Sequence, residues 1–427
     1  MKHELKDRKV LVAGMGKSGV AAMELLRRHG ADVVTSDEKP MGNVLPQTED
    51  TFTSVDLIVL SPGVPIDIPP VRAARAKGIP IIGEVELASY FLRGPVCGIT
   101  GSNGKTTTTA LIGHVLKECG IPCQVGGNIG TAPTAMAETS KDDQWNVLEL
   151  SSFQLETIDE FRAQIAVCTN ITPDHLDRHH TLETYANAKG RLFETQAADG
   201  HAVLNADDVT CVAYASRTPA TPHWFSRSSR SEVWFDGATI FVDHEPLLRA
   251  EDLPIRGVHN VENAMAAILA TRLAGAFDHA IGSALRTFPG VEHRLEFVRE
   301  HNGVRYYNDS KATNVDATEK AIDAFPGNLW IILGGKDKNS DYTVLREKLQ
   351  QKAKAVMLIG AAAPKIAEQL QGLALVESGT LDQALDWAAS RAGAGDIVLL
   401  APACASFDQF DNFEHRGRVF KELVRSL

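Results

Sequence analysis

Short apolar runs separated by stretches of helical periodicity make up the first part of the chain. The runs KVLVAGM (9–15), ADVVTSD (31–37) and DLIVLSPG (56–63) predict buried strands. The segment after the first run predicts a helix that ends at Gly30. This alternation is typical of a parallel sheet covered by helices.

The same alternation restarts after two Gly- and Pro-containing breaks, FLRGP (91–95) and FPGVEHR (288–294). Between the breaks the pattern predicts strands at 96–100, 146–150, 164–171 and 201–205, a hairpin at 232–243 and a helix at 261–275. After the second break it predicts paired strands around Asn302-Gly303, buried strands at 328–335, 355–360 and 396–402, and a C-terminal helix. We therefore predict three consecutive α/β domains, at 1–92, 93–290 and 291–427.

Composition narrows the class of protein. The 427 residues carry a formal net charge of −11, which disfavours a nucleic-acid partner because such binding needs a basic surface. The six cysteines are scattered without a CxxC pair, as expected of reduced thiols in a cytoplasmic protein. We find no signal peptide and no apolar run of the ~18 residues that a membrane span needs, so no membrane association is expected.

The first glycine-rich turn, Gly14-x-Gly16-x-x-Gly19, joins the first predicted strand to the first helix, and Asp37 ends the second strand. This is the fingerprint of a Rossmann-like, dinucleotide-binding domain. Glycines let the backbone approach any diphosphate, so a nicotinamide or flavin cofactor, a UDP-sugar, and a turn without a ligand all remain open.

The second glycine-rich turn, Gly101-Ser-Asn-Gly104-Lys105-Thr106, is a phosphate loop between a strand and a helix. Its first glycine is missing, because Ile99 stands where the full motif has Gly. Backbone N–H groups can still bind phosphates, Lys105 can reach the terminal phosphates, and Thr106 can ligate Mg²⁺. This motif predicts a P-loop nucleotide site in the central domain.

Further polar clusters follow predicted strands. Glu149 ends one strand, where either a hard-cation ligand or a solvated carboxylate fits. The cluster Asn170-x-x-x-Asp174-His175 has no cysteine at ligand spacing, which disfavours zinc, and we expect His179 and His180 to be exposed loop residues. NDSKATN (308–314) and GGKDK (334–338) are basic turns of the kind that bind ligands in α/β domains.

In combination these motifs resemble those of the Mur ligase family. GSNGKTTTT, LELSSFQLE, TNITPDHLDRH, HNVEN, EHRLE, NDSKATN and GGKDK occur in that family's order, and GMGKSG, SPGV and PACASFDQFDNFEHRGRVF are similar to the branch that adds D-glutamate. The resemblance covers nearly the whole chain. It implies an ATP- and Mg²⁺-dependent ligase that joins D-glutamate to UDP-N-acetylmuramoyl-L-alanine, acting as a cytoplasmic monomer. It also implies a Rossmann-like third domain.

The resemblance also implies roles for individual residues. Those at the UDP-substrate are Gly14, Gly16, Lys17, Ser18, Asp37, Gly63, Asn128 and His175. Those at ATP are Gly101, Ser102, Asn103, Gly104, Lys105, Thr106, Thr107, Asn260, Asn263, Arg294 and Asp309. Those at D-glutamate are Lys311, Thr313, Lys338, Ser406 and Phe413, with Lys338 preferred over Lys336. The implied metal ligands are Thr106, Glu149, His175 and Lys189 as a carbamate, and the implied catalytic residues are Lys105, His175 and Lys189.

Three other functions compete with this interpretation. A nicotinamide dehydrogenase explains the first glycine-rich turn but leaves the phosphate loop unused. A folylpolyglutamate-synthase-like ligase shares the central and C-terminal motifs but lacks a UDP-binding domain before the phosphate loop. A non-enzymatic P-loop switch or scaffold needs neither an acceptor carboxylate nor an amino acid.

Overall fold

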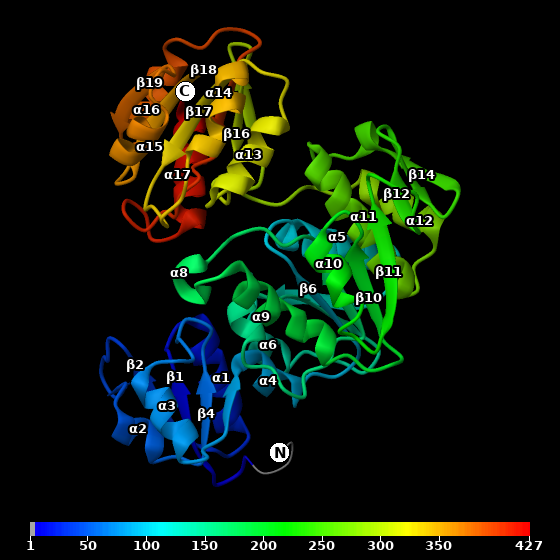
Figure 1. Ribbon diagram of the computed structural model, residues 1–427, viewed down its shortest axis with the longest axis vertical. Coiled ribbons are helices and arrows are strands. Elements are labelled where there is room, and N and C mark those ends of the chain that lie inside the picture. Colours follow the sequence, from blue (N-terminus) through cyan, green and yellow to red (C-terminus); the bar gives the residue numbers. More distant parts are fainter. Residues whose placement is uncertain (1–4) are drawn as a thin grey trace. The chain divides into compact units, whose positions relative to one another are not determined.

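The computed structural model describes residues 5–427, which divide into two compact units. One unit comprises residues 5–252 and 262–287, and the other comprises residues 253–261 and 288–427. Within these described residues the chain forms three sheets, of which two belong to the first unit (Figure 1). None of the helices formed by residues 5–427 combines the length and the apolar character that crossing a membrane requires.

The N-terminal sheet is parallel, with strand order β3-β2-β1-β4-β5. Its strands are β1 (Lys9–Ala13), β2 (Asp32–Asp37), β3 (Leu45–Pro46), β4 (Leu57–Leu60) and β5 (Ile81–Gly83), and its helices are α1 (Lys17–Arg28), α2 (Glu49–Thr53), α3 (Pro69–Ala76) and α4 (Glu84–Ser89). Alternate residues of β1 enter two cores: Val10 packs with α1, and Leu11 packs with α2 and α3. Helices on both faces explain why β1 reads as an uninterrupted apolar run.

The central sheet has the order β14-β13-β12-β11-β10-β9-β6-β8-β7 within the described chain. Its strands are β6 (Val96–Thr100), β7 (Cys123–Gly127), β8 (Trp145–Glu149), β9 (Ile165–Cys168), β10 (His201–Asn205), β11 (Thr221–Ser226), β12 (Val233–Phe235), β13 (Thr239–Val242) and β14 (Glu245–Arg249). Strands β6 to β12 pair in parallel, and β13 and β14 add an antiparallel edge. The hairpin predicted at Asp236-Gly237 is the β12–β13 turn.

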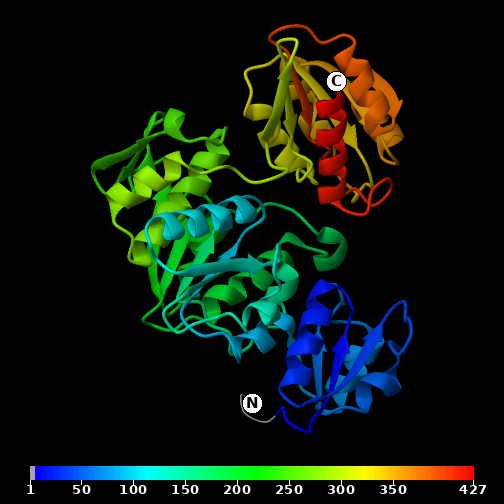
Figure 2. The same cartoon turned by 180° about the vertical axis from the view of Figure 1, so that it is seen from behind.

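Helices cover the central sheet and carry many of the predicted site residues. They are α5 (Lys105–Glu118), α6 (Pro133–Met136), α7 (Ser152–Leu155), α8 (Leu176–His179), α9 (Leu182–Glu194), α10 (Val209–Tyr214), α11 (Val258–Leu273) and α12 (Asp278–Arg286), with a short 3-10 turn at Ala250–Asp252. Helix α5 lies across β6, β7 and β8 and is the long cyan helix in Figure 2.

Two buried carboxylates on α4 fasten the N-terminal sheet to the central one. Glu84 Oε1 accepts hydrogen bonds from the backbone N–H (2.8 Å) and hydroxyl (2.6 Å) of Thr134 at the start of α6. Glu86 accepts three backbone N–H bonds, at 2.7, 3.0 and 3.0 Å, from the 159–161 loop. The segment after β5 is therefore part of the central packing rather than a free linker.

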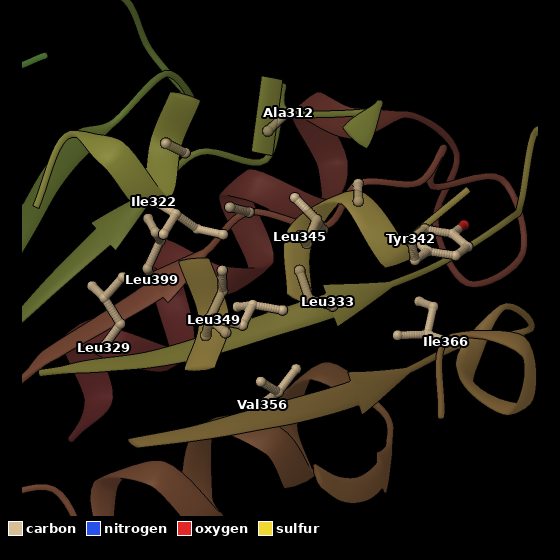
Figure 3. Packing of buried hydrophobic residues seen from close by; sticks show 14 of the residues in the cluster. Ala312, Ile322, Leu329, Leu333, Tyr342, Leu345, Leu349, Val356, Ile366 and Leu399 are labelled. Atoms are coloured by element: carbon tan, nitrogen blue, oxygen red, sulfur yellow. The ribbon is translucent and has the colours of Figure 1, made fainter. Parts of the chain in front are cut away.

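The second unit is built on a sheet of order β15-β16-β20-β17-β18-β19. Its elements are β15 (Glu296–His301), β16 (Val304–Asn308), α13 (Val315–Asp323), β17 (Leu329–Gly334), a 3-10 turn (Thr343–Leu345), α14 (Arg346–Lys352), β18 (Ala353–Ile359), α15 (Ala363–Gln369), β19 (Leu375–Gly379), α16 (Leu381–Ala389), β20 (Ile397–Leu400) and α17 (Phe413–Ser426). The core on one face joins Leu329 and Leu333 of β17 to Ile322 and Leu349 of the covering helices (Figure 3). Trp330 and Ile332 point to the other face, which α16 and α17 cover.

Candidate active site

The phosphate loop connects β6 to α5, as the sequence predicts. Gly101 and Gly104 have φ values of 139° and 87°, in the region that favours glycine. A Cβ on Gly104 would lie 2.1 Å from Asn263 Oδ1, and one on Gly101 would lie 2.0 Å from Thr169 Oγ1. Lys105 begins α5, and its Nζ donates to the carbonyls of Gly101 (2.8 Å) and Ser102 (2.7 Å). Because α5 begins here, its N-terminal N–H groups and dipole favour an anion at this loop.

The segment that follows β9 braces this loop. Asn103 N–H donates to Asn170 Oδ1 (3.0 Å), and Asn103 O accepts from Asn170 Nδ2 (3.0 Å) and from the Thr169 hydroxyl (2.6 Å). The Ser102 hydroxyl donates to Thr172 O (2.8 Å). Part of the polar cluster that begins at Asn170 therefore shapes the phosphate loop.

Lys189 is buried beside the same loop. Its side chain, on α9, is 1% exposed, and Nζ donates to Gly101 O at 2.8 Å. Burial lowers the pKa of Lys189 well below its usual value, and the positive charge of Lys105 lowers it further. A solvated surface lysine, the ordinary alternative for this position, is thus excluded by the geometry.

Two further predicted metal ligands are Glu149, at the end of β8, and His175, which directly precedes α8. Glu149 is 1% exposed at the end of β8, and its Oε1 accepts from Asn128 Nδ2 at 2.9 Å. His175 has a φ of 54°, and its ring meets the edge of the Phe153 ring at a centroid distance of 4.9 Å. Residues 5–427 contain no cluster of three or more His, Cys, Asp or Glu side chains placed to hold a metal. The Thr106 hydroxyl and a lysine carbamate are oxygen donors of the kind that Mg²⁺ prefers.

The expectation that His179 is exposed is wrong. The side chain is 2% exposed, stacks on the Phe153 ring, and places Nε2 2.9 Å from Ser152 Oγ. Burial and the neighbouring Arg178 charge lower the pKa of His179 to about 4, so the ring is neutral at physiological pH. His180 is exposed, as expected.

A cavity of about 400 Å³ opens at the first glycine-rich turn, at the carboxyl ends of the N-terminal strands. Seven of the residues predicted for the UDP-substrate line it: Gly14, Gly16, Lys17, Ser18, Asp37, Gly63 and Asn128. His175 is not among the lining residues. Backbone N–H groups of Met15 (2.7 Å) and Lys39 (3.0 Å) donate to the Asp37 carboxylate and lower its pKa, so Asp37 also holds the turn itself.

The lining includes residues for which the motifs gave no role: Glu38, Gln47, Ser61, Pro62, Val64, Pro65, Gly127 and Gln154. Gln154 belongs to the LELSSFQLE motif, so its position near the site could have been predicted from the sequence. Gln47 follows β3, a two-residue strand that the apolar pattern does not reveal.

A second cavity, of about 620 Å³, lies within the second unit. Asn260 and Arg294, both predicted at the nucleotide, line it. Asp309 is buried, and desolvation raises its pKa to about 6 although the Arg294 charge opposes the rise. Asn263 lies on the same helix as Asn260 but contacts α5 instead, through Thr108 Oγ1 at 3.4 Å. Asn260 and Arg294 thus line the same cavity, and Asn263 is not among its lining residues.

The residues predicted at D-glutamate follow β16, β17 and β20, which are adjacent and parallel. Lys311 Nζ lies 5.2 Å from the centre of the Phe413 ring. Thr313 N–H donates to Lys311 O at 2.8 Å, and Ser406 is 2% exposed. Lys338 lies in the loop after β17. These side chains thus gather at one edge of the sheet.

A fully buried arginine that sequence reasoning missed holds these loops together. Arg416 donates to the Ser310 hydroxyl (3.0 Å), to Ser310 O (2.9 Å) and to Cys404 O (3.2 Å). Ser310 in turn donates to Phe413 O at 2.8 Å. The FEHRGRVF helix carries this arginine, but the helical pattern does not show that the side chain points into the loops.

A phosphate loop that opens a helix, beside a Rossmann-like sheet with a cavity at its glycine-rich turn, defines a nucleotide-binding α/β protein of several domains. Family models match three consecutive stretches: "Mur ligase MurD-like, N-terminal domain" at residues 8–83, "Mur ligase middle domain" at 99–271 and "Mur ligase, glutamate ligase domain" at 293–404. The chain belongs to the Mur ligase family. The predicted fold class is confirmed.

Individual relatives agree with this family. The UDP-N-acetylmuramoylalanine--D-glutamate ligase of Solibacter usitatus is 57% identical over 437 residues, covering 99% of both chains. The enzyme of the same name from Acidobacterium capsulatum is 51% identical and covers 99% of this chain and 97% of its own.

Solved structures share the fold. The MurF ligase of Thermotoga maritima in complex with ADP superposes with a TM-score of 0.67 at 19% identity, covering 100% of this chain and 97% of its own. The UDP-N-acetylmuramate-alanine ligase MurC of the same organism gives a TM-score of 0.65 at 19% identity, covering 98% and 99%.

Proposed function

We propose that this protein is an ATP-dependent ligase that adds D-glutamate to UDP-N-acetylmuramoyl-L-alanine in peptidoglycan precursor synthesis. The observation that carries the proposal is 57% identity, over 99% of both chains, to a relative named for that reaction. The match of residues 8–83 to a MurD-like N-terminal domain weighs against the folylpolyglutamate-synthase alternative, and the phosphate loop weighs against a dehydrogenase.

The reaction requires an activated carboxylate. The alanine carboxylate of the UDP-linked substrate attacks the γ-phosphorus of ATP, the bond to the bridging oxygen breaks, and ADP leaves with the bond's electron pair. The amine of D-glutamate then attacks the acyl carbon of the resulting acyl phosphate, loses a proton, and expels inorganic phosphate. Lys105 and the N-terminus of α5 are suited to neutralise the phosphate charge that develops in the first step.

Substrate binding is proposed for three groups of residues. The cavity beside Gly14 and Gly16 is proposed for the UDP-linked substrate, with the diphosphate at the N-terminus of α1. Asn260, Arg294 and Asp309 are proposed for the nucleotide. Lys311, Thr313, Lys338, Ser406 and Phe413 are proposed for D-glutamate, since two ammonium groups at one sheet edge suit a dicarboxylate.

The donors near the phosphate loop fit Mg²⁺, which prefers oxygen ligands. Thr106, Glu149, His175 and a carbamate of Lys189 are the proposed ligands. A lysine whose pKa is strongly lowered holds an uncharged amine, which can attack CO₂ to give a carbamate and release a proton. When bound, Mg²⁺ would supply positive charge to the phosphate oxygens. His175 and Lys189 are proposed as ligands that orient this charge, alongside Lys105.

Domain organisation and cellular context complete the proposal. We propose domains at 1–92, 93–290 and 291–427, supported by the gaps between the matched stretches 8–83, 99–271 and 293–404. We further propose a cytoplasmic location, supported by six free cysteines in the described chain, as a reducing compartment would leave them. We also propose that the protein is a monomer.

The test is ADP release measured over a panel of UDP-linked precursors and amino acids. ADP release that requires both UDP-N-acetylmuramoyl-L-alanine and D-glutamate is expected. Release with L-glutamate and a folate, or release that needs no acceptor at all, would contradict the proposal and favour the alternative ligase or the P-loop switch.

A further inference from the structure

Arg178 of α8 reaches from the central domain to the loop that follows β4. Its guanidinium donates to Pro62 O at 2.9 Å and to Val64 O at 3.3 Å. The same group pairs with Glu156 at 3.0 Å and lies 4.2 Å above the Phe153 ring. The side chains of the ion pair are 17% and 11% exposed, so solvent screens the contact little.

The loop that Arg178 holds is one wall of the 400 Å³ cavity. Pro62, Gly63 and Val64 all line that cavity. The loop is also tied to the glycine-rich turn, because the Ser61 hydroxyl donates to Gly14 O at 2.6 Å. Arg178 therefore fixes the outer side of a loop whose inner side faces the proposed UDP-substrate.

The other end of this network is the segment that carries His175. Arg178 N–H donates to His175 O at 3.1 Å within the first turn of α8. The second oxygen of Glu156 lies 3.4 Å from Nδ1 of the buried His179. Arg178 and its partner Glu156 thus join the cavity wall to the segment that carries His175.

We propose that Arg178 is a positioning residue for the UDP-linked substrate, a role that rests on the function proposed above. Its planar guanidinium has donors enough for two carbonyls and a carboxylate at once, which sets the cavity wall in register with the His175 segment. A lysine offers one point charge on a flexible stem and cannot reproduce this fork. Arg178 does not touch the substrate in this role, because it acts through the 62–64 backbone.

The experiment compares Arg178→Ala and Arg178→Lys with wild type in steady-state kinetics and in calorimetric binding of UDP alone. Both variants are expected to weaken UDP binding and raise the KM for the UDP-linked substrate about tenfold, the equivalent of ~1.4 kcal/mol. The KM for ATP is expected to change less than about twofold, since the lost contacts lie in the wall of the UDP cavity and not at the phosphate loop. Added guanidinium ion should restore the UDP affinity of Arg178→Ala but not that of Arg178→Lys, whose side chain still fills the space.

Arg191→Ala is the matched control. Arg191 is a part-buried arginine of the same domain that donates to Leu155 O (3.1 Å) and to Ile158 O, both within the central domain. The Arg191→Ala variant should leave UDP binding unchanged. Unchanged UDP affinity in Arg178→Lys, or equal losses for UDP and ATP, would overturn the positioning role. Wild-type protein that binds UDP but releases no ADP with D-glutamate would instead contradict the proposed function.

Discussion

The two glycine-rich turns of the first unit have the same topology but use their glycines differently. At the turn between β1 and α1, a Cβ on Gly16 would meet nothing within 4 Å, whereas one on Gly19 would lie 1.9 Å from Gly14 O. At the turn between β6 and α5, both Gly101 and Gly104 face protein side chains at about 2 Å. In the first turn, Gly16 therefore has free space on the side of the cavity. In the second turn, side chains of the protein fill the space beside both glycines.

Glycines in the same kind of strand–turn–helix motif therefore serve two different purposes in this chain. Gly19 serves the packing of helix on strand, and Gly16 leaves room for something outside the protein. In the phosphate loop, the lysine side chain itself lies against the loop carbonyls. Substitutions at the two turns should consequently fail in different ways.

The largest expected effect is a loss of kcat on substitution of Lys189. This lysine lies against the second turn, where it is a proposed metal ligand, and the first turn has no equivalent residue. Lys189→Ala should lower kcat by about three orders of magnitude while leaving the fold intact, as removal of a proposed metal ligand does. Lys189→Arg should be as inactive, since guanidinium stays positive and forms no carbamate. Small carboxylic acids should partly restore Lys189→Ala. Full activity in Lys189→Arg would eliminate the carbamate hypothesis.

Gly104→Ala tests the closed turn. The new Cβ would press on Asn263 Oδ1 at 2.1 Å with φ at 87°, so the loop must shift, and kcat/KM for ATP should fall about a hundredfold. Gly120→Ala is the control, since Gly120 ends the same helix with φ at 73° and nothing within 4 Å. The control should lose only about 1 kcal/mol of stability. Equal ATP kinetics in the two variants would show that the Asn263 contact does not matter.

Gly16→Ala and the bulkier Gly16→Val test the open turn. Nothing in the protein resists a side chain there, so the melting temperature should be unchanged while the KM for the UDP-linked substrate rises about tenfold. Gly19→Ala should do the reverse and destabilise the fold, because its Cβ would meet the Gly14 carbonyl. A parallel loss of ATP affinity in Gly16→Ala would argue against a diphosphate at this turn.

The last prediction concerns stability rather than catalysis, at Glu84, which links the sheets that carry the two turns. Burial raises its pKa to about 7 from an ordinary value of 4.5, although the Thr134 hydrogen bonds oppose the rise. The folded state therefore holds the proton more tightly, and stability falls as pH rises from 4.5 to 7, by about 3 kcal/mol at most. Melting temperatures at pH 5 and pH 8 should show Glu84→Gln gaining on wild type at the higher pH. A difference between the two proteins that does not vary with pH would contradict this assignment.

The apolar pattern predicted the buried parallel strands well, because strands covered on both faces are apolar throughout. It also located the hairpin at Asn302-Gly303, where both residues adopt positive φ values of 51° and 76°, as a tight two-residue turn requires. Several strands were missed, among them β3 and β14 at sheet edges. β3 is two exposed residues, and β14 (Glu245–Arg249) contains a proline, so neither carries an apolar signal.

The candidate site likewise has a part that the sequence predicted and a part that it did not. The phosphate loop is a local motif, and its strand–turn–helix geometry follows from neighbouring residues. Its bracing by Thr169 and Asn170 joins positions more than sixty residues apart in the sequence, which no local pattern contains. His179 was misjudged for the same reason, since its burial depends on Phe153 and Tyr185 from other elements.

The two glutamates of α4 have a consequence for exchanging modules between relatives. A chimera that joins a foreign N-terminal domain just after β5 keeps Glu84 and Glu86 with the central domain, and so retains the caps on α6 and on the 159–161 loop. A crossover placed after α4 brings in foreign residues at both positions and strips those backbone N–H groups of their acceptors if the carboxylates are lost. Recombination between diverged members should therefore tolerate the earlier junction better, even though the later one looks more like an interdomain boundary in the sequence.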